Sequence, residues 1–102
     1  MAKYHVHDYD GITSVAKEHC HGYVRTTDVQ TMYALFNHIH YMEGETTFDK
    51  RHRHAYRGYT GPAIYTNGGH VHYYYLETSV DKEHFHVMEG HTGLQKSVRK
   101  SN

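Results

Sequence analysis

The sequence is short of the residues that usually hold a small domain together. It has one cysteine, one proline and no tryptophan, and apolar residues make up 37% of its 102 positions. A single cysteine excludes internal disulfides, and eleven of the apolar residues are tyrosines, which keep a polar hydroxyl. Small domains with thin cores usually gain stability from disulfides, bound metal or oligomerisation. With disulfides excluded, the composition favours metal or oligomerisation.

Net charge and long apolar runs are also missing. Eleven basic residues balance eleven acidic ones, so no basic surface indicates nucleic acid or a membrane as partner. The start "MAKYHVHDYD" lacks the apolar segment of a signal peptide, and no run approaches the length of a membrane span. Together with the free cysteine, this predicts a cytoplasmic protein, and the length predicts one domain over residues 1–102.

Histidine is the residue in excess, and it is arranged in a repeat. Twelve of the thirteen histidines form six H-x-H pairs, whose first members are separated by 14, 19, 14, 18 and 14 residues. The alternation predicts three tandem copies, at 5–37, 38–69 and 70–102. Within the last copy, the basic segment 95–102 is expected to be a frayed tail.

A tyrosine or methionine follows two residues after every pair. The resulting unit, H-x-H-x-(Tyr/Met), has the period of a β-strand, so its three large side chains should share one face of a sheet. The sequence therefore predicts an all-β fold: a six-stranded antiparallel meander, or a small barrel or sandwich, built from three β-hairpins. Aligning the pairs across the hairpins would place His7 opposite His19 and a bend at Thr13, with equivalents at Thr46 and Thr78. The same alignment across the long gaps sets His21 against His38 and His54 against His70, with bends at Val29/Gln30 and Pro62.

A band of paired histidines on strands is suited to metal binding. Imidazoles at positions i and i+2 point the same way, and two facing pairs can offer four nitrogens to one ion. At three or four ligands per ion, twelve histidines would serve about three or four ions. The alternatives for such a band are a hydrogen-bonded ladder and a pH sensor. The predicted metal ligands are His5, His7, His19, His21, His38, His40, His52, His54, His70, His72, His84, His86 and the unpaired His91.

The other donors are weaker candidates. Strict alternation places several acidic residues on the opposite face, from which they could only support the histidines, and the tyrosines beside the pairs are expected to pack rather than to bind metal. Imidazole suits zinc, iron, copper and nickel, and we expect zinc or iron first. The acidic residues near the pairs are Asp8, Asp10, Glu18, Glu43, Asp49, Glu77, Asp81, Glu83 and Glu89.

Three functions are compatible with this pattern. The first is a multinuclear metal-binding protein that stores or buffers several ions or is stabilised by them. The second is a metalloenzyme, an oxidase or hydrolase, with an open coordination position. The third is a structural protein whose subunits are linked by metal in a homo-oligomer.

The chain resembles the small histidine-rich bacterial proteins of the YmaF-like family. The resemblance is carried by "HVHDYDG", "HIHYMEGETT", "TGPAIYTNGGHVHYYYLETSVDKEHFH" and "HTG". It implies no particular reaction. Cys20, in the motif "HCH", occupies the position that Val6 and Ile39 hold in other pairs. It is therefore expected to face away from the histidines rather than to bind metal.

Overall fold

The computed structural model describes residues 4–32 and 37–98, and these form nine β-strands and no helix. The predicted all-β class and the antiparallel pairing are confirmed. In these residues there is accordingly no helix long and apolar enough to cross a membrane. The strands are β1 (Tyr4–Ile12), β2 (Gly22–Thr26), β3 (Gln30–Met32), β4 (His38–Glu45), β5 (Ala55–Tyr59), β6 (Ala63–Thr66), β7 (Gly69–Glu77), β8 (Val87–His91) and β9 (Gln95–Val98).

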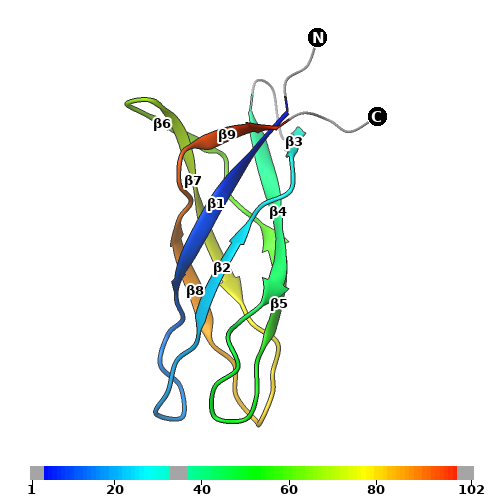
Figure 1. Ribbon diagram of the computed structural model, residues 1–102, viewed down its shortest axis with the longest axis vertical. Helices are drawn as coiled ribbons and strands as arrows, with labels where there is room; N and C mark the ends of the chain where they lie inside the picture. The colour runs from blue at the N-terminus through cyan, green and yellow to red at the C-terminus, as the bar shows by residue number, and fades with distance from the viewer. Residues whose placement is uncertain (1–3, 33–36, 99–102) are drawn as a thin grey trace.

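Three long hairpins determine the shape of the molecule. They are β1–β2, β4–β5 and β7–β8, and each continues beyond its strands into an irregular tip (Figure 1). The three tips gather at one end of the long axis, and the short strands β3, β6 and β9 lie toward the other end. The molecule is correspondingly elongated, with extents of 47 × 30 × 23 Å.

The strands belong to three separate sheets rather than to one six-stranded meander. The sheets have the orders β2-β1-β9, β3-β4-β5 and β6-β7-β8, and the described strands do not close into a barrel. Strand β9 lies beside β1, where Val98 faces Tyr4 and Gln95 faces His7. The expected frayed tail is therefore corrected for residues 95–98, which form a strand; residues 99–102 lie outside the described part. The last of the described strands thus completes the sheet that contains the first.

The predicted register of the hairpins was wrong. Across β1–β2, Asp8 faces Thr26 and Ile12 faces Gly22, so His7 lies at the level of Thr27 and not of His19. The second H-x-H of each repeat lies beyond the strands, in the hairpin tip. The two pairs of one hairpin are consequently at opposite ends of it. His21 and His38 belong to different ends as well, so the pairing expected across the long gap does not form.

The chain reverses at two-residue turns, which are not at the predicted threonines. Ala16 bridges His19 around Lys17 and Glu18, which both have positive φ, of 52° and 67°. The same turn occurs at Lys50–Arg51 and Lys82–Glu83. Two successive positive φ values are the pattern of a type I′ turn, for which Asn-Gly is the common sequence. Because Lys-Glu and Lys-Arg carry no such signal, the sequence did not reveal the position of the turn.

The interior between the hairpins is filled by one layer of tyrosine and methionine. It contains the residues that follow the H-x-H pairs, Tyr9, Tyr23, Met42, Tyr56, Tyr74 and Met88, together with Leu76. The hydroxyl groups of Tyr9 and Tyr56, and those of Tyr23 and Tyr74, are 2.9 Å apart, so each buried hydroxyl has a partner. As predicted, the large side chains of the H-x-H-x-(Tyr/Met) unit face inward together.

Candidate metal centres

The structure gathers twelve histidines into two groups of six. The strand cluster comes from the first pair of each repeat and contains His5, His7, His38, His40, His70 and His72. The turn cluster comes from the second pair and contains His19, His21, His52, His54, His84 and His86. Within each group one ring nitrogen per histidine lies within 4.8 Å of all the others. The Tyr/Met layer lies between them, so the single band of twelve histidines expected from the sequence is divided in two.

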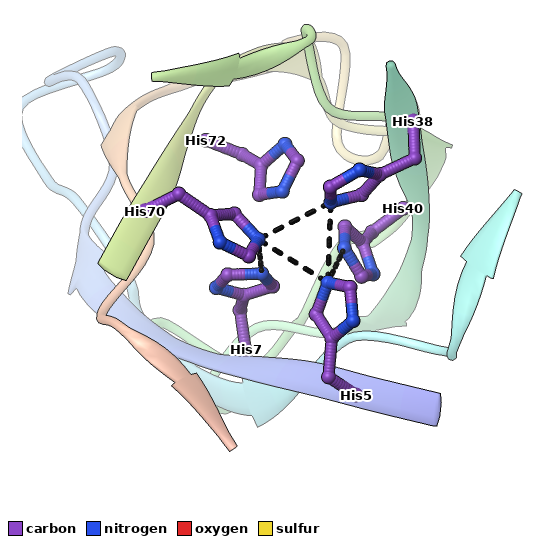
Figure 2. Close-up of side chains that lie close together, drawn as sticks. All are labelled: His5, His7, His38, His40, His70 and His72. Atoms are coloured by element: carbon purple, nitrogen blue, oxygen red, sulfur yellow. Dashed lines mark hydrogen bonds between the residues drawn. The ribbon is translucent and has the colours of Figure 1, made fainter. Parts of the chain in front are cut away.

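In the strand cluster the six rings point toward a common centre (Figure 2). They come in pairs from the three central strands β1, β4 and β7. The Nε2 atoms of His5, His38 and His70 form a triangle with sides of 3.1, 3.2 and 3.2 Å. The second members of the pairs lie deeper, with the Nε2 of His7 3.1 Å from that of His70.

The inner histidine of every pair is held at two points. The backbone N–H of His7 donates to Oγ1 of Thr27, and its ring Nδ1 donates to the carbonyl oxygen of Gly93 at 2.9 Å. His40 and His72 repeat this with Thr60 and Thr92. In the turn cluster the threonines are Thr13, Thr46 and Thr78. All six inner histidines are at most 1% exposed.

These threonines were missed as functional residues, although the sequence carried a signal. Thr27, Thr60 and Thr92 occupy the same position of the three repeats, as do Thr13, Thr46 and Thr78. The second set was predicted only to mark the bends of the hairpins. A buried threonine repeated in step with a buried histidine is a reason to look for a hydrogen bond that orients the histidine.

The tip turns position the outer histidines of the turn cluster. In each tip, Nδ1 of the outer histidine donates to the carbonyl oxygen of the first turn residue, at 3.1 Å in all three copies. Neighbouring tips are joined by Ser14, Thr47 and Ser79, whose carbonyl oxygens accept from Nδ1 of His86, His21 and His54. Every ring of the turn cluster is therefore anchored through Nδ1 to the backbone.

This anchoring fixes which nitrogen carries the proton. A carbonyl oxygen only accepts, so an Nδ1 bonded to it must hold the hydrogen, and Nε2 of the neutral ring is then a bare lone pair. All six Nε2 atoms of the turn cluster are acceptors of this kind. Nevertheless, the Nε2 atoms of His19 and His21 lie 3.1 Å apart, as do those of His52 and His54. Two acceptors cannot hydrogen-bond each other. The turn cluster is thus a cage of lone pairs, in which a cation at the centre would satisfy all six.

Unpaired nitrogens point to the same conclusion. Among the described residues, Nε2 of His72, His84 and His86 is buried without a hydrogen-bond partner. Leaving a buried polar atom unpaired costs about 1–3 kcal/mol. Two of the three atoms belong to the turn cluster and one to the strand cluster, so both groups lack a partner that a cation would supply.

The rings of the strand cluster are strongly biased toward the neutral form that binds metal. Burial, as the main cause, lowers the pKa of His5, His7 and His72 to about 4 and that of His40 to about 3. Burial also lowers the pKa of His54 and His86 in the turn cluster. Since a protonated imidazole cannot coordinate a metal, the fold keeps these rings ready as ligands at neutral pH.

Acid should therefore destabilise the metal-free protein. In the unfolded chain these histidines take up protons near pH 6.5, whereas in the folded chain they do so only near pH 4. The unfolded state binds more protons in this window, so the free energy of unfolding should fall as pH decreases from 6.5 to 4. Urea unfolding of chelator-treated protein at several pH values measures this. A free energy of unfolding that stays constant over the window would contradict it.

Two carboxylates lie beside the turn cluster. Oδ2 of Asp49 is 3.5 Å from Nδ1 of His21, and Oδ2 of Asp81 is 3.3 Å from Nδ1 of His54. The equivalent position of the first repeat is Ala16, so the third inner histidine has no such neighbour. A carboxylate next to Nδ1–H makes the imidazole a stronger ligand. None of the acidic candidates, Asp49 and Asp81 included, is a member of either group.

His91 and Cys20 lie outside the two clusters. His91 is exposed at the end of β8, where its ring meets that of Tyr73 with centroids 5.4 Å apart. Cys20 is a half-buried free thiol between His19 and His21 and is not grouped with them as a metal donor. The tyrosines of the H-x-H-x-(Tyr/Met) units form the core layer and are likewise outside both groups.

Fold and site together define a class of protein: a small all-β chain that carries buried histidines in two groups of six. The chain belongs to the YmaF family, whose description is spore germination protein GerY/YamF, and it matches this family over residues 1–60 and 49–102. The resemblance inferred from the H-x-H motifs is thereby confirmed. No match was found among curated proteins or among solved structures.

Proposed function

We propose that the protein binds two transition-metal ions, one in each histidine cluster, and that it serves as a metal store stabilised by its own cargo. The observation that carries this proposal is the turn cluster, where six Nε2 lone pairs converge and their tautomers are fixed by backbone carbonyls. Imidazole is a common ligand for zinc, iron, nickel and copper. Two ions, rather than the three or four expected from the sequence, follow from the division into two groups.

The arrangement favours a store over the two other functions. A metalloenzyme needs an open coordination position for water or substrate. Here six donors surround each centre, and the inner three are buried. A metal that links subunits would draw ligands from more than one chain, whereas one chain supplies all six donors of each cluster. The family description gives spore germination as the setting in which such a store would act.

Metal analysis of protein purified without an affinity tag tests the proposal. Two ions per chain are expected, because each cluster surrounds one centre. Replacing His7 and His40 by alanine should reduce the content to one ion, since it removes two inner donors of the strand cluster and leaves the turn cluster intact. The control His91→Ala should keep two ions. A metal-free protein that also fails to take up added metal would refute the proposal.

The two carboxylates at the turn cluster give the sites unequal affinities. In the double variant Asp49→Asn/Asp81→Asn, the metal affinity of the turn cluster should fall by about tenfold, the lower end for such supporting groups, since both carboxylates are partly exposed. The strand cluster should be unaffected. Competition against a coloured chelator resolves the two affinities. Asp8→Asn, which changes an exposed carboxylate paired with Lys96, is the matched control. Equal weakening of both sites would contradict this prediction.

A further inference from the structure

The contacts between the rings have a specific geometry. In both clusters each imidazole packs edge-on against four of the other five rings and does not contact the fifth. In the strand cluster the pairs that do not touch are His5 with His72, His7 with His38, and His40 with His70. In the turn cluster they are His19 with His54, His21 with His84, and His52 with His86. Six points arranged as three opposite pairs are the corners of an octahedron.

The distances agree with that geometry and give the size of the cage. Eight neighbouring pairs in the two clusters bring their Nε2 atoms to 3.1 to 3.3 Å, and all six donor atoms of each cluster lie within 4.8 Å of one another. In a regular octahedron the distance from corner to centre is the edge length divided by the square root of two, so edges of this length correspond to about 2.2 to 2.3 Å from Nε2 to the centre. Four-coordinate zinc holds imidazole nitrogen closer, at about 2.0–2.1 Å. The cages are therefore slightly too large for a tetrahedral ion and have two donors too many.

The rings cannot easily rearrange around four positions. Each inner histidine is held at its backbone N–H by a threonine hydroxyl and at its ring by a carbonyl, and each outer ring of the turn cluster is held by its turn carbonyl. Binding a tetrahedral ion would leave two Nε2 lone pairs of the same cage without a partner. Because an unpaired buried acceptor is unfavourable, this arrangement favours an ion that accepts all six donors.

Charge limits the oxidation state. The six donors of each cage are neutral imidazoles, and neither group includes a thiolate or a carboxylate. Burying a trivalent ion among neutral ligands leaves more uncompensated charge than burying a divalent one. Magnesium and calcium are excluded by donor type because they require oxygen ligands.

We propose that both cages select octahedral divalent ions of the first transition series, those of the manganese-to-nickel group, over tetrahedral zinc and tetragonal copper. This inference rests on the proposed function. It changes the expected order of metals, because sequence reasoning had put zinc with iron first. With six histidines filling all six coordination positions, ferrous iron in such a cage would have no free position at which oxygen or peroxide could bind.

Cobalt(II) reports the geometry directly. Titrated into chelator-treated protein, it should bind at two equivalents and give the weak pink absorption of six-coordinate cobalt. The intense blue absorption of four-coordinate cobalt would overturn the inference and leave the proposed function standing. Cobalt that does not bind at all would overturn the proposed function itself, and with it this inference.

A second measurement uses zinc, the ion with the strongest preference for four ligands. X-ray absorption of the zinc-loaded wild-type protein should show six nitrogen neighbours at about 2.2 Å, and four neighbours at about 2.0–2.1 Å would overturn the inference. In the variant His5→Ala/His38→Ala, the strand cluster retains four donors, and its cobalt spectrum should change from weak to intense. If this variant does not fold, the two wild-type measurements decide the matter.

Discussion

Complete removal of metal is expected to lower the melting temperature of the protein by about 30 °C or more. An ion present at about a thousand times its dissociation constant stabilises the folded state by about 4 kcal/mol, so two ions contribute about 8 kcal/mol. The total stability of a small domain is about 5–15 kcal/mol. Metal would therefore account for most of the stability of this fold.

The physical reason lies in the thin interior. The buried apolar core consists of four tyrosines, two methionines and one leucine, and at both ends of it the protein interior is imidazole. Without a cation, the lone pairs of the turn cluster face one another at close range. The experiment is a thermal melt at pH 7.5, before and after chelation, with metal content measured on the same sample. Returning metal should restore the original melting temperature. Equal melting temperatures in loaded and fully metal-free protein would show that the ions do not support the fold.

The second large effect is a gain in stability, expected when the backbone strain of the hairpin turns is removed. Six non-glycine residues at the hairpin tips have positive φ: Lys17, Glu18, Lys50, Arg51, Lys82 and Glu83. The left-handed conformation costs an L-residue about 1–2 kcal/mol, and Asn-Gly is the sequence that adopts such a turn most readily. Replacing all three turns by Asn-Gly should therefore stabilise the protein by several kcal/mol, about 1–2 kcal/mol per turn.

This substitution should leave metal binding unchanged. The turn residue contacts the outer histidine through its backbone carbonyl, which Asn-Gly retains. Urea unfolding of the metal-free variant measures the gain, and metal analysis checks that two ions remain. Ala substitution of all six turn residues is the control: it removes the same charges without relieving the strain. If the Asn-Gly variant is no more stable than this control, the turns are not strained.

The sequence predicted which side chains face inward better than it predicted which of them meet. The two-residue period of H-x-H-x-(Tyr/Met) placed the histidines and the tyrosines correctly on one face. That period carries no information on register, which depends on where the chain turns. Here the turns are built from Lys-Glu and Lys-Arg, so the usual Gly or Asn signal was missing. Placing the bend at Thr13 instead of at Lys17–Glu18 merged two clusters into one band.

The wrong hairpin register also led to the wrong number of ligands per ion. With His7 opposite His19, three or four donors per ion was the expected count, and zinc or iron the expected metal. In the structure, three hairpins each contribute one pair to each end, so the count is six. The pairing of β9 with β1 was equally inaccessible, because it joins segments from the two ends of the described chain, and no local pattern records such a contact.

The pairing of β9 with β1 has a consequence for the symmetry of the chain. Each sheet consists of a long strand, its hairpin partner and one short strand. One repeat of 32 to 33 residues contains one strand of each kind, but its short strand pairs with the long strand of the next repeat, and that of the third repeat pairs with β1. A peptide of a single repeat would therefore assemble as a ring of three, each copy lending its end strand to its neighbour. Such a trimer would possess both octahedral cages on its symmetry axis. The present chain has the same arrangement within one covalent chain, and it departs from exact threefold symmetry at Ala16, which stands where the other two repeats have Asp49 and Asp81.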